Sequence, residues 1–527
     1  MSPPFPLYWI ICVRPHNSKD YRFCLNITGF FLPSTSKILF CIIIEIAILL
    51  PDCYDKSIMM EAPNGTAQVT NMDKGLSIHP DFFPVFRFTL PTIIMMVFMA
   101  LYTVVDGIFL SQWVNTDALA AVNIVGPFLY TVIAFGNMFG AGGSAVVAHK
   151  LGAGAPETAR RYFTALLILS GSTGAILSVL AFVFQGGLLQ LLGASPLLLP
   201  YCRAYFTALL PFIPFGLIQT FFHYFFVTAG KPQIGMAVAL AASFTKIALE
   251  YLFIAILGWG VFGAALATGI GYTVPSVFAI SYFTLQKKTD LRIAPPLFRA
   301  RIIGRSMANG ASEMISVMAG SLAVFVFNLT MIERVGEDGV AAISILLYSQ
   351  NLWTALYIGF SNGVAPLLSY TLGTQDGKRL RRLFVQCIRS ITLFSVATYV
   401  ISLLSANNFF TIFAPPGSPV FRLASEGFPF FAISYIFIGF NIFSSAFFTS
   451  LGNARVSATI SFLRTFVFLL GALLLLPSFL GMNGIWFAVS AAELLTFPFS
   501  LFFFFKYRSI YHYSLYSKAT QRQHTKV

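Results

Sequence analysis

Charged residues are scarce in this chain. Only 10% of its 527 residues are Asp, Glu, Lys or Arg, against about 25% in soluble domains, and 57% are hydrophobic. A globular core cannot hide so much apolar surface, so the composition predicts a polytopic membrane protein. The net charge of +14 is typical of basic cytoplasmic loops, and we expect no nucleic-acid partner.

Cysteine is also rare, and the motifs of common enzymes are absent. Four of the six cysteines fall in the first 53 residues and no CxxC occurs, which argues against a disulfide framework or a cysteine metal site. The chain has no HExxH zinc motif, no GxSxG serine elbow and no segment long enough for a nucleotide-binding domain. We therefore expect no enzyme activity, no ATP-driven pump, no cofactor, and no metal beyond a coupling Na⁺.

What the chain does contain is an internal repeat at an offset of 221 residues. Asp117–Asn123 (DALAAVN) matches Asp338–Ser344 (DGVAAIS), and Leu151-Gly152 matches Leu372-Gly373. A duplicated membrane segment is typical of two-lobed transporters whose substrate site lies between the lobes. The offset covers six predicted spans, an even number, so both halves enter the membrane in the same direction and form a parallel repeat.

Runs of roughly 20 apolar residues, enough to cross the hydrocarbon core, divide the chain into domains. They predict an all-α polytopic membrane protein with twelve transmembrane helices in two six-helix lobes. We assign an N-terminal extension (1–80), an N-lobe (81–284), a linker (285–305), a C-lobe (306–505) and a basic tail (506–527). The twelve predicted spans are about 84–112, 118–149, 160–184, 202–228, 233–257, 261–284, 306–333, 339–370, 384–405, 425–450, 454–477 and 482–505.

Basic residues follow the even-numbered spans and indicate the orientation. The connections that follow the odd-numbered spans hold only two basic residues, Arg334 and Arg422, and Arg203 lies at the edge of a span. By the positive-inside rule we expect a multi-pass protein of the cell inner (plasma) membrane with both termini cytoplasmic. The basic residues on the predicted cytoplasmic side include Lys150, Arg160, Arg161, Lys231, Lys287, Lys288, Arg305, Lys378, Arg379, Arg381, Arg382, Arg455 and Lys506.

Residues 1–80 fit no part of the repeat. The apolar run Ile38–Leu50 is short for a span and contains Glu45. It resembles the apolar core of a signal peptide, but it starts late and no clear cleavage site follows. We interpret this segment as an extension or as upstream sequence, with Met59, Met60 or Met72 as more natural starts. A natively expressed protein whose N-terminal sequence begins at Met1 would contradict the second interpretation.

We single out seven ionisable residues inside the predicted spans, where each costs at least ~2.5 kcal/mol at the helix centre. Lys246 and Glu250 are four residues apart, share a helix face and can pair, either structurally or as a switchable site. For Arg464 and Glu493, on adjacent helices, we favour a structural clamp. The seven are Asp106, His223, Lys246, Glu250, Glu313, Arg464 and Glu493.

Asp106 and Glu313 have no obvious partner in the sequence, so we favour functional roles for both. An intramembrane acid can bind a proton or a cation and attract a cationic drug. His223 is titratable, although a lone membrane histidine is more often a hydrogen-bonded interior residue. Pro91 breaks the backbone hydrogen-bond ladder of the helix that carries Asp106. At the repeat offset the acids are not duplicated, which indicates that the chemistry of the two lobes has diverged.

The motifs resemble those of the multidrug and toxic compound extrusion (MATE) family, of the bacterial type with an aspartate in helix 1. The resemblance covers roughly residues 80–510. Each motif is weak evidence alone, but together and in this order they are strong evidence for the family. They are Phe88-Thr89-Leu90-Pro91, Tyr102-x-x-Val105-Asp106-Gly107, Gly140-x-Gly142-Gly143, Ala229-Gly230-Lys231-Pro232, Asn309-Gly310-x-Ser312-Glu313 and Gly363-x-x-Pro366.

The resemblance implies two six-helix bundles around a central cleft and export of organic, often cationic, compounds against Na⁺ or H⁺. It implies that Asp106 is the helix-1 coupling site, with Tyr102 one turn before it and Pro91 as the hinge. Lys246 and Glu250 match a helix-5 pair that is often Asn-x-x-x-Asp. The lysine amine could take the place of Na⁺, which favours protons. Thr268 would be the helix-6 polar partner, and Glu313 resembles a helix-7 acid of some branches.

We therefore expect a cation-coupled antiporter that works by alternating access, as a monomer in the lipid bilayer, on small organic substrates. The alternative is a flippase for a lipid-linked precursor, which would favour a strongly basic cavity. Because four acids stand against two bases among those seven ionisable residues, we rank the flippase lower.

Overall fold

The computed structural model describes residues 11–12, 24–25, 76–113, 116–286, 291–511 and 513, with only the backbone for 102–113 and 116–120. The chain separates into two units, Met1–Gln68 and Val69–Val527. In the first unit, β1 (Ile11–Cys12) pairs antiparallel with β2 (Cys24–Leu25). The predictions for Ile38–Leu50 and for a start at Met59, Met60 or Met72 lie outside the described residues.

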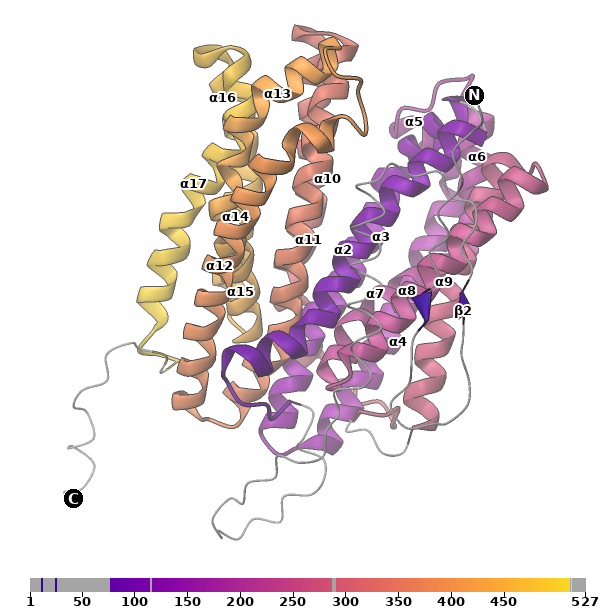
Figure 1. Cartoon of the computed structure of the whole chain (residues 1–527). Coiled ribbons are helices and arrows are strands. Elements are labelled where there is room, and N and C mark those ends of the chain that lie inside the picture. Colours follow the sequence, from indigo (N-terminus) through magenta and orange to yellow (C-terminus); the bar gives the residue numbers. More distant parts are fainter. Residues whose placement is uncertain are drawn as a thin grey trace, which may run out of the picture. The chain divides into compact units, whose positions relative to one another are not determined.

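In the second unit, the N-lobe is a bundle of helices that follow one another directly along the chain (Figure 1). Two of its spans contain a change of helix type. These elements are α2 (Phe82–Trp113), α3 (Thr116–Gly152), α4 (Pro156–Val183), α5 (Gln185–Leu191), α6 (Leu199–Leu209), the 3-10 turn η1 (Leu210–Phe212), α7 (Ile213–Thr228), α8 (Pro232–Glu250), the π-helix η2 (Tyr251–Ile256) and α9 (Gly260–Leu285).

The C-lobe repeats this order of long helices. Its fourth span is bent by 51° between α13 and α14, and its fifth contains a π-helix. The elements are α10 (Ala300–Arg334), α11 (Glu337–Gly373), α12 (Gly377–Phe410), α13 (Pro419–Ala432), α14 (Ser434–Ser450), α15 (Ala454–Phe462), the π-helix η3 (Leu463–Leu469), α16 (Leu470–Leu480) and α17 (Met482–Tyr507).

The number of spans agrees with the prediction from hydropathy. Among the described residues, eleven helices are long and apolar enough to cross a membrane, and the bent pair α13–α14 makes twelve. The short α5 was not predicted, because seven residues give too little periodic pattern to recognise. Helix α10 begins at Ala300, inside the segment predicted as linker. Its first two turns carry Arg301 and Arg305, which hydropathy assigned to a loop.

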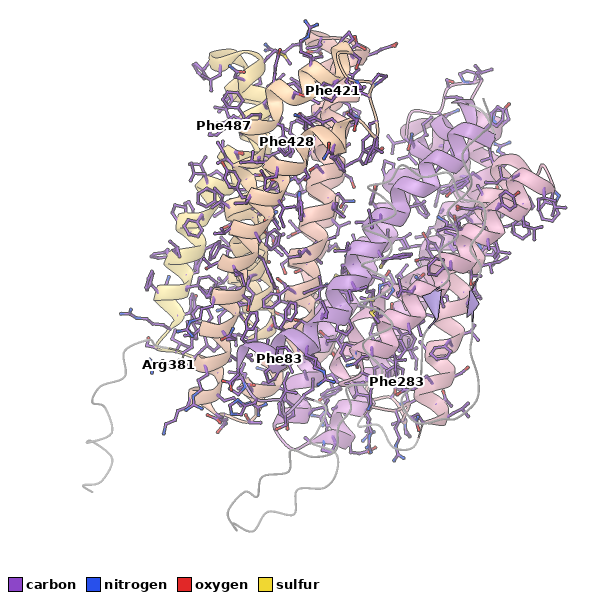
Figure 2. All side chains as sticks on the ribbon, in the orientation of Figure 1. Phe83, Phe283, Arg381, Phe421, Phe428 and Phe487 are labelled. Atoms are coloured by element: carbon purple, nitrogen blue, oxygen red, sulfur yellow. The ribbon has the colours of Figure 1, made fainter. Side chains whose placement is uncertain are left out.

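Each lobe has its own aromatic core. In the N-lobe, Phe163 of α4 contacts Phe221 and Phe225 of α7 and Phe283 of α9, with ring centroids 5.0 to 6.0 Å apart. In the C-lobe, Phe428 lies in a cluster formed by α10, α11, α13, α16 and α17. Figure 2 shows Phe283 in the first bundle and Phe428 in the second. A further cluster packs α2 against α11 and so joins the two lobes.

The lobes meet along α2 and α3 on one side and α10 and α11 on the other. We call the end that carries the connections 152–156, 373–377 and 450–454 the basic end, because Lys150, Arg305 and Lys378 lie near it. A Cβ atom added to Gly152 would overlap the carbonyl oxygen of Tyr370, and one added to Gly373 would overlap that of His149. These two contacts are related by the 221-residue offset.

The same pattern continues away from the basic end. A Cβ on Gly142 would overlap the carbonyl oxygen of Ser306, and one on Gly363 would lie 2.9 Å from Thr89. A Cβ on Gly359 would come within 2.6 Å of the Cα of Ile93. We call these backbone contacts the glycine seam. From Gly152 to Met138, which contacts Gly310, the seam follows α3 for about 21 Å at 1.5 Å per residue.

Candidate functional site

The helix-1 site predicted from the resemblance lies on α2. The backbone of Tyr102 and Asp106 is helical, but their side chains lie outside the described residues. Helix α2 continues through Pro91, which is buried. The residues on either side of Pro91 belong to the glycine seam, since Thr89 and Ile93 contact α11. The predicted hinge therefore lies where the two lobes touch.

Lys246 and Glu250 form the predicted pair on α8. The Nζ atom of Lys246 lies 3.2 Å from Oε1 of Glu250, and the two side chains are only 6% and 2% exposed. Glu250 is the last residue of α8, and the chain continues as the π-helix η2. A π-helical turn disturbs the regular ladder and is frequent at functional sites. A buried ion pair at such a turn is a candidate for a switchable charge.

Helix α9 supplies the surroundings of this pair. The methylene groups of Lys246 lie against Gly271, where an added Cβ would be 3.3 Å from the lysine Cβ. Thr268, the predicted helix-6 partner, is 5% exposed and lies one turn before Gly271. The structure thus places Thr268 on the helix that covers Lys246. Helix α2 packs on the other side of α8 through Met95 and Met236.

Arg464 and Glu493 also pair as predicted. Both Nε and Nη2 of Arg464 lie 2.7 Å from Oε1 of Glu493. Asn441 of α14 donates to the other carboxylate oxygen at 2.8 Å, and Ser500 donates to Asn441 at 2.9 Å. This carboxylate has donors on both oxygens, which is how a buried charge is tolerated in a membrane.

The two ion pairs share a structural feature that is not found by comparing residues 221 positions apart. In each lobe the fifth span passes into a π-helix, η2 in the N-lobe and η3 in the C-lobe. Glu250 precedes η2 directly, and Arg464 is the second residue of η3. The acids are not duplicated at equivalent positions, yet in the described part of each lobe a buried ion pair lies at the π-helix of the fifth span.

Glu313 lies near the boundary between the lobes. It is partly exposed on α10 and interacts electrostatically with Arg464 of its own lobe and with Tyr224 of the N-lobe. The Tyr224 hydroxyl donates to Oδ1 of Asn137 at 3.3 Å and interacts with the side chain of Asn362 on α11. These groups form a polar cluster that spans both lobes.

Sequence reasoning missed three members of this cluster: Asn137, Tyr224 and Asn362. They come from α3, α7 and α11 and are neutral, so the search for charges inside spans passed over them. Asparagine within an apolar helix is itself an available signal, because an unsatisfied amide in hydrocarbon is costly.

His223 is separate from these charged groups. It is 9% exposed on α7, between the aromatic residues Phe222 and Tyr224, and its Nε2 has no hydrogen-bond partner among the described residues. In the described part of the chain, no three His, Cys, Asp or Glu side chains are placed to hold a metal ion together.

Comparison with known proteins gives consistent matches. A family model described as MatE matches residues 91–252 and 312–474, and the two matches begin 221 residues apart. The multidrug export protein MepA of Staphylococcus haemolyticus (strain JCSC1435) is 24% identical over 416 residues, covering 78% of this chain and 90% of that protein. MepA of Staphylococcus aureus (strain bovine RF122 / ET3-1) is 21% identical over 418 residues, covering 79% and 91%.

The fold is also that of solved structures. A multidrug resistance MATE family transporter of the MOP superfamily, in an outward-facing conformation, aligns with a TM-score of 0.79 at 22% identity. The alignment covers 84% of this chain and all of that one. Because the family model matches more than half of the sequence, and matches it once in each lobe, this chain belongs to the MatE family of multidrug transporters.

Proposed function

We propose that this protein is a proton-coupled antiporter that exports organic, chiefly cationic, compounds across the plasma membrane by alternating access. The contact between Lys246 and Glu250 is the observation that favours H⁺ over Na⁺ as the coupling ion. An ammonium group 3.2 Å from the carboxylate already supplies the positive charge that a bound Na⁺ would bring. Proton uptake changes the charge of such a carboxylate without requiring space for a metal ion.

Alternating access is supported by where the lobes touch. The glycine seam holds the lobes together towards the basic end, and the helices diverge towards the ends labelled α6 and α13 (Figure 1). Under the positive-inside rule the basic end is cytoplasmic, with both termini on that side. The structure would then be the outward-facing state, and transport requires the seam to separate.

The N-lobe charges would couple protons to this movement. In the outward-facing state Asp106 takes up a proton, with Tyr102, Lys246, Glu250 and Thr268 as the polar residues around the coupling site. Loss of the negative charge weakens the attraction for a cationic substrate, which leaves outward. Helix α2 then bends at Pro91, within the seam, and the lobes reorient.

Glu313 is the proposed acid of the C-lobe on the substrate path. It is partly exposed and lies close to the lobe boundary through Tyr224, so an organic cation between the lobes would meet it. For His223, the other titratable candidate, no contact among the described residues supports a role. A flippase is not favoured, because Lys246 and Arg464 are each paired with an acid.

Uptake of ethidium into inverted membrane vesicles tests this function, because export from the cell corresponds to movement into an inverted vesicle. A proton gradient alone should drive transport, a sodium gradient alone should not, and Asp106→Asn should abolish the proton-driven component. Glu313→Gln should weaken transport of the cation, because the substrate loses a carboxylate partner. Transport driven by sodium alone would overturn the choice of proton, and normal transport by both variants would overturn the site assignment.

A further inference from the structure

A continuous strip of hydroxyl groups runs through the C-lobe where α14 and α15 face each other. Ser445 and Thr449 are one turn apart on α14, and Ser457 and Ser461 are one turn apart on α15. Ser312 of α10 completes the strip. These side chains are at most 7% exposed.

The hydroxyls hydrogen-bond one another in sequence. Ser312 lies 3.1 Å from Thr449, and Thr449 lies 2.7 Å from Ser457. Ser457 lies 3.0 Å from Ser445, which lies 2.9 Å from Ser461. In all four contacts either oxygen can be the donor. A chain of groups that both donate and accept can pass a proton along by exchanging which oxygen donates.

The strip connects two different environments. At its deep end, the next turn of α14 carries Asn441, which holds Glu493, and the next residues of α15 lead into η3 with Arg464. At its other end, towards the basic end, lie Asn309 and Ser306. Asn309 Oδ1 and Ser306 Oγ are buried and have no hydrogen-bond partner among the described residues. Buried oxygens of this kind are usually satisfied by water.

We propose that this hydroxyl strip is a proton relay between Glu493 and the basic end of the C-lobe. A proton on the Glu493 carboxyl passes through one water molecule to Ser461. Each hydroxyl oxygen gains one proton and releases its own to the next, through Ser445, Ser457 and Thr449 to Ser312. The last proton leaves to water beside Asn309. Glu493 becomes a carboxylate, the hydroxyls remain neutral, and one proton has crossed.

The relay deepens the proposed antiport, on which it rests, by linking proton movement to the substrate acid. Glu493 on α17 and Arg464 on η3 lie near the deep end, whereas Glu313 on α10 directly follows Ser312 at the other end of the strip. Arg464 contacts Glu493 directly and also acts electrostatically on Glu313. When Glu493 is protonated, Arg464 is free to neutralise Glu313 and displace a cationic substrate. When the relay removes that proton, Arg464 returns to Glu493 and Glu313 is available again.

The test compares two substitutions of Thr449 in proteoliposomes. Thr449→Val keeps the shape and removes the hydroxyl, whereas Thr449→Ser keeps the hydroxyl. Ser450→Ala is the matched control, because the Ser450 side chain is equally buried on α14 but its hydroxyl donates to the Ala446 carbonyl of its own helix. Two rates are measured for each protein: proton-driven ethidium uptake, and counterflow of labelled against unlabelled ethidium, which needs no net proton movement.

We expect Thr449→Val to slow proton-driven uptake by about 100-fold, as for loss of a proton-transfer group, and to leave counterflow unchanged. Thr449→Ser and Ser450→Ala should match the wild type in both rates. Ser457→Ala breaks the same relay and should behave like Thr449→Val, which provides a second variant if valine impairs folding.

Equal proton-driven rates for the valine and serine variants would overturn the relay. Equal loss of both rates in Thr449→Val would also overturn it, because the hydroxyl would then serve only helix packing. If the wild type itself shows counterflow but no proton-driven uptake, the proposed coupling is wrong and the relay fails with it. Only that last result contradicts the proposed function.

Discussion

Replacing Glu250 by glutamine is expected to abolish proton-driven efflux and to destabilise the protein. The substitution removes the carboxylate that Lys246 contacts at 3.2 Å while the lysine side chain remains 6% exposed. Removing one partner of a buried ion pair typically costs 3–5 kcal/mol, since the remaining charge is uncompensated. Thermal unfolding in detergent and ethidium uptake into inverted vesicles measure the two effects separately.

A double variant distinguishes a structural clamp from a coupling site. Lys246→Met with Glu250→Leu removes both charges, and apolar replacement of a whole buried pair is often neutral for stability. We expect its unfolding temperature to return towards that of the wild type while proton-driven efflux stays absent. Recovery of efflux together with stability would show that the pair only holds the lobe together.

The pair formed by Arg160 and Glu157 provides the control for this experiment. The Glu157 side chain is 63% exposed, and its oxygen lies 3.4 Å from Arg160. Exposed ion pairs contribute little to stability because water and salt screen them. Glu157→Gln should therefore leave both unfolding and efflux close to the wild type, and a large effect there would argue against burial as the cause of the Glu250 phenotype.

Alanine at Gly152 should drive the lobes apart at the basic end. Its Cβ would overlap the carbonyl oxygen of Tyr370, a backbone atom that cannot rotate away. Overpacking of this kind costs typically 1–3 kcal/mol, which corresponds to about a 5- to 150-fold shift against the state in which the lobes touch. Gly373→Ala, at the repeat-related contact with His149, should have the same effect.

Cysteine labelling measures this shift. Ser306, whose carbonyl oxygen contacts Gly142 across the seam, is 1% exposed. In a Ser306→Cys background, Gly152→Ala should speed labelling by a water-soluble maleimide. Gly320→Ala is the control, since a Cβ at Gly320 meets nothing within 4 Å. Both Gly→Ala substitutions raise helix propensity to a similar degree. If only the Gly152 variant is labelled faster, the cause is therefore the clash of its Cβ with the Tyr370 carbonyl. Equal labelling of the two variants would contradict a role for the seam.

Local patterns in the chain were enough to predict the spans, the repeat and the two ion pairs. Crossing a bilayer demands a continuous apolar helix, so hydropathy locates each span within a few residues. The pair Lys246–Glu250 follows from i, i+4 spacing on one helix, and Arg464–Glu493 follows from the cost of leaving either charge alone in the membrane. These inferences use neighbours along the chain or on adjacent helices.

Contacts between distant helices could not be predicted in this way. Tyr224 and Asn137 are 87 residues apart, and Ser312 and Thr449 are 137 apart. A serine in an apolar helix usually bonds back to its own backbone, and many here do, so composition alone does not separate the relay residues from the rest. The π-helices η2 and η3 leave no recognisable signature, because YLFIAI and LRTFVFL differ from each other and resemble the helical segments around them.

The amino-acid order alone therefore settled that this is a twelve-span, two-lobed member of a transporter family, because hydrophobicity and repetition are properties of the chain itself. Only the tertiary structure determined which polar groups lie in contact. Glycines bring the backbones of neighbouring helices together, and the packing of α10, α14 and α15 aligns their hydroxyl groups. Those meetings depend on the packing of whole helices against one another, which no single stretch of sequence encodes.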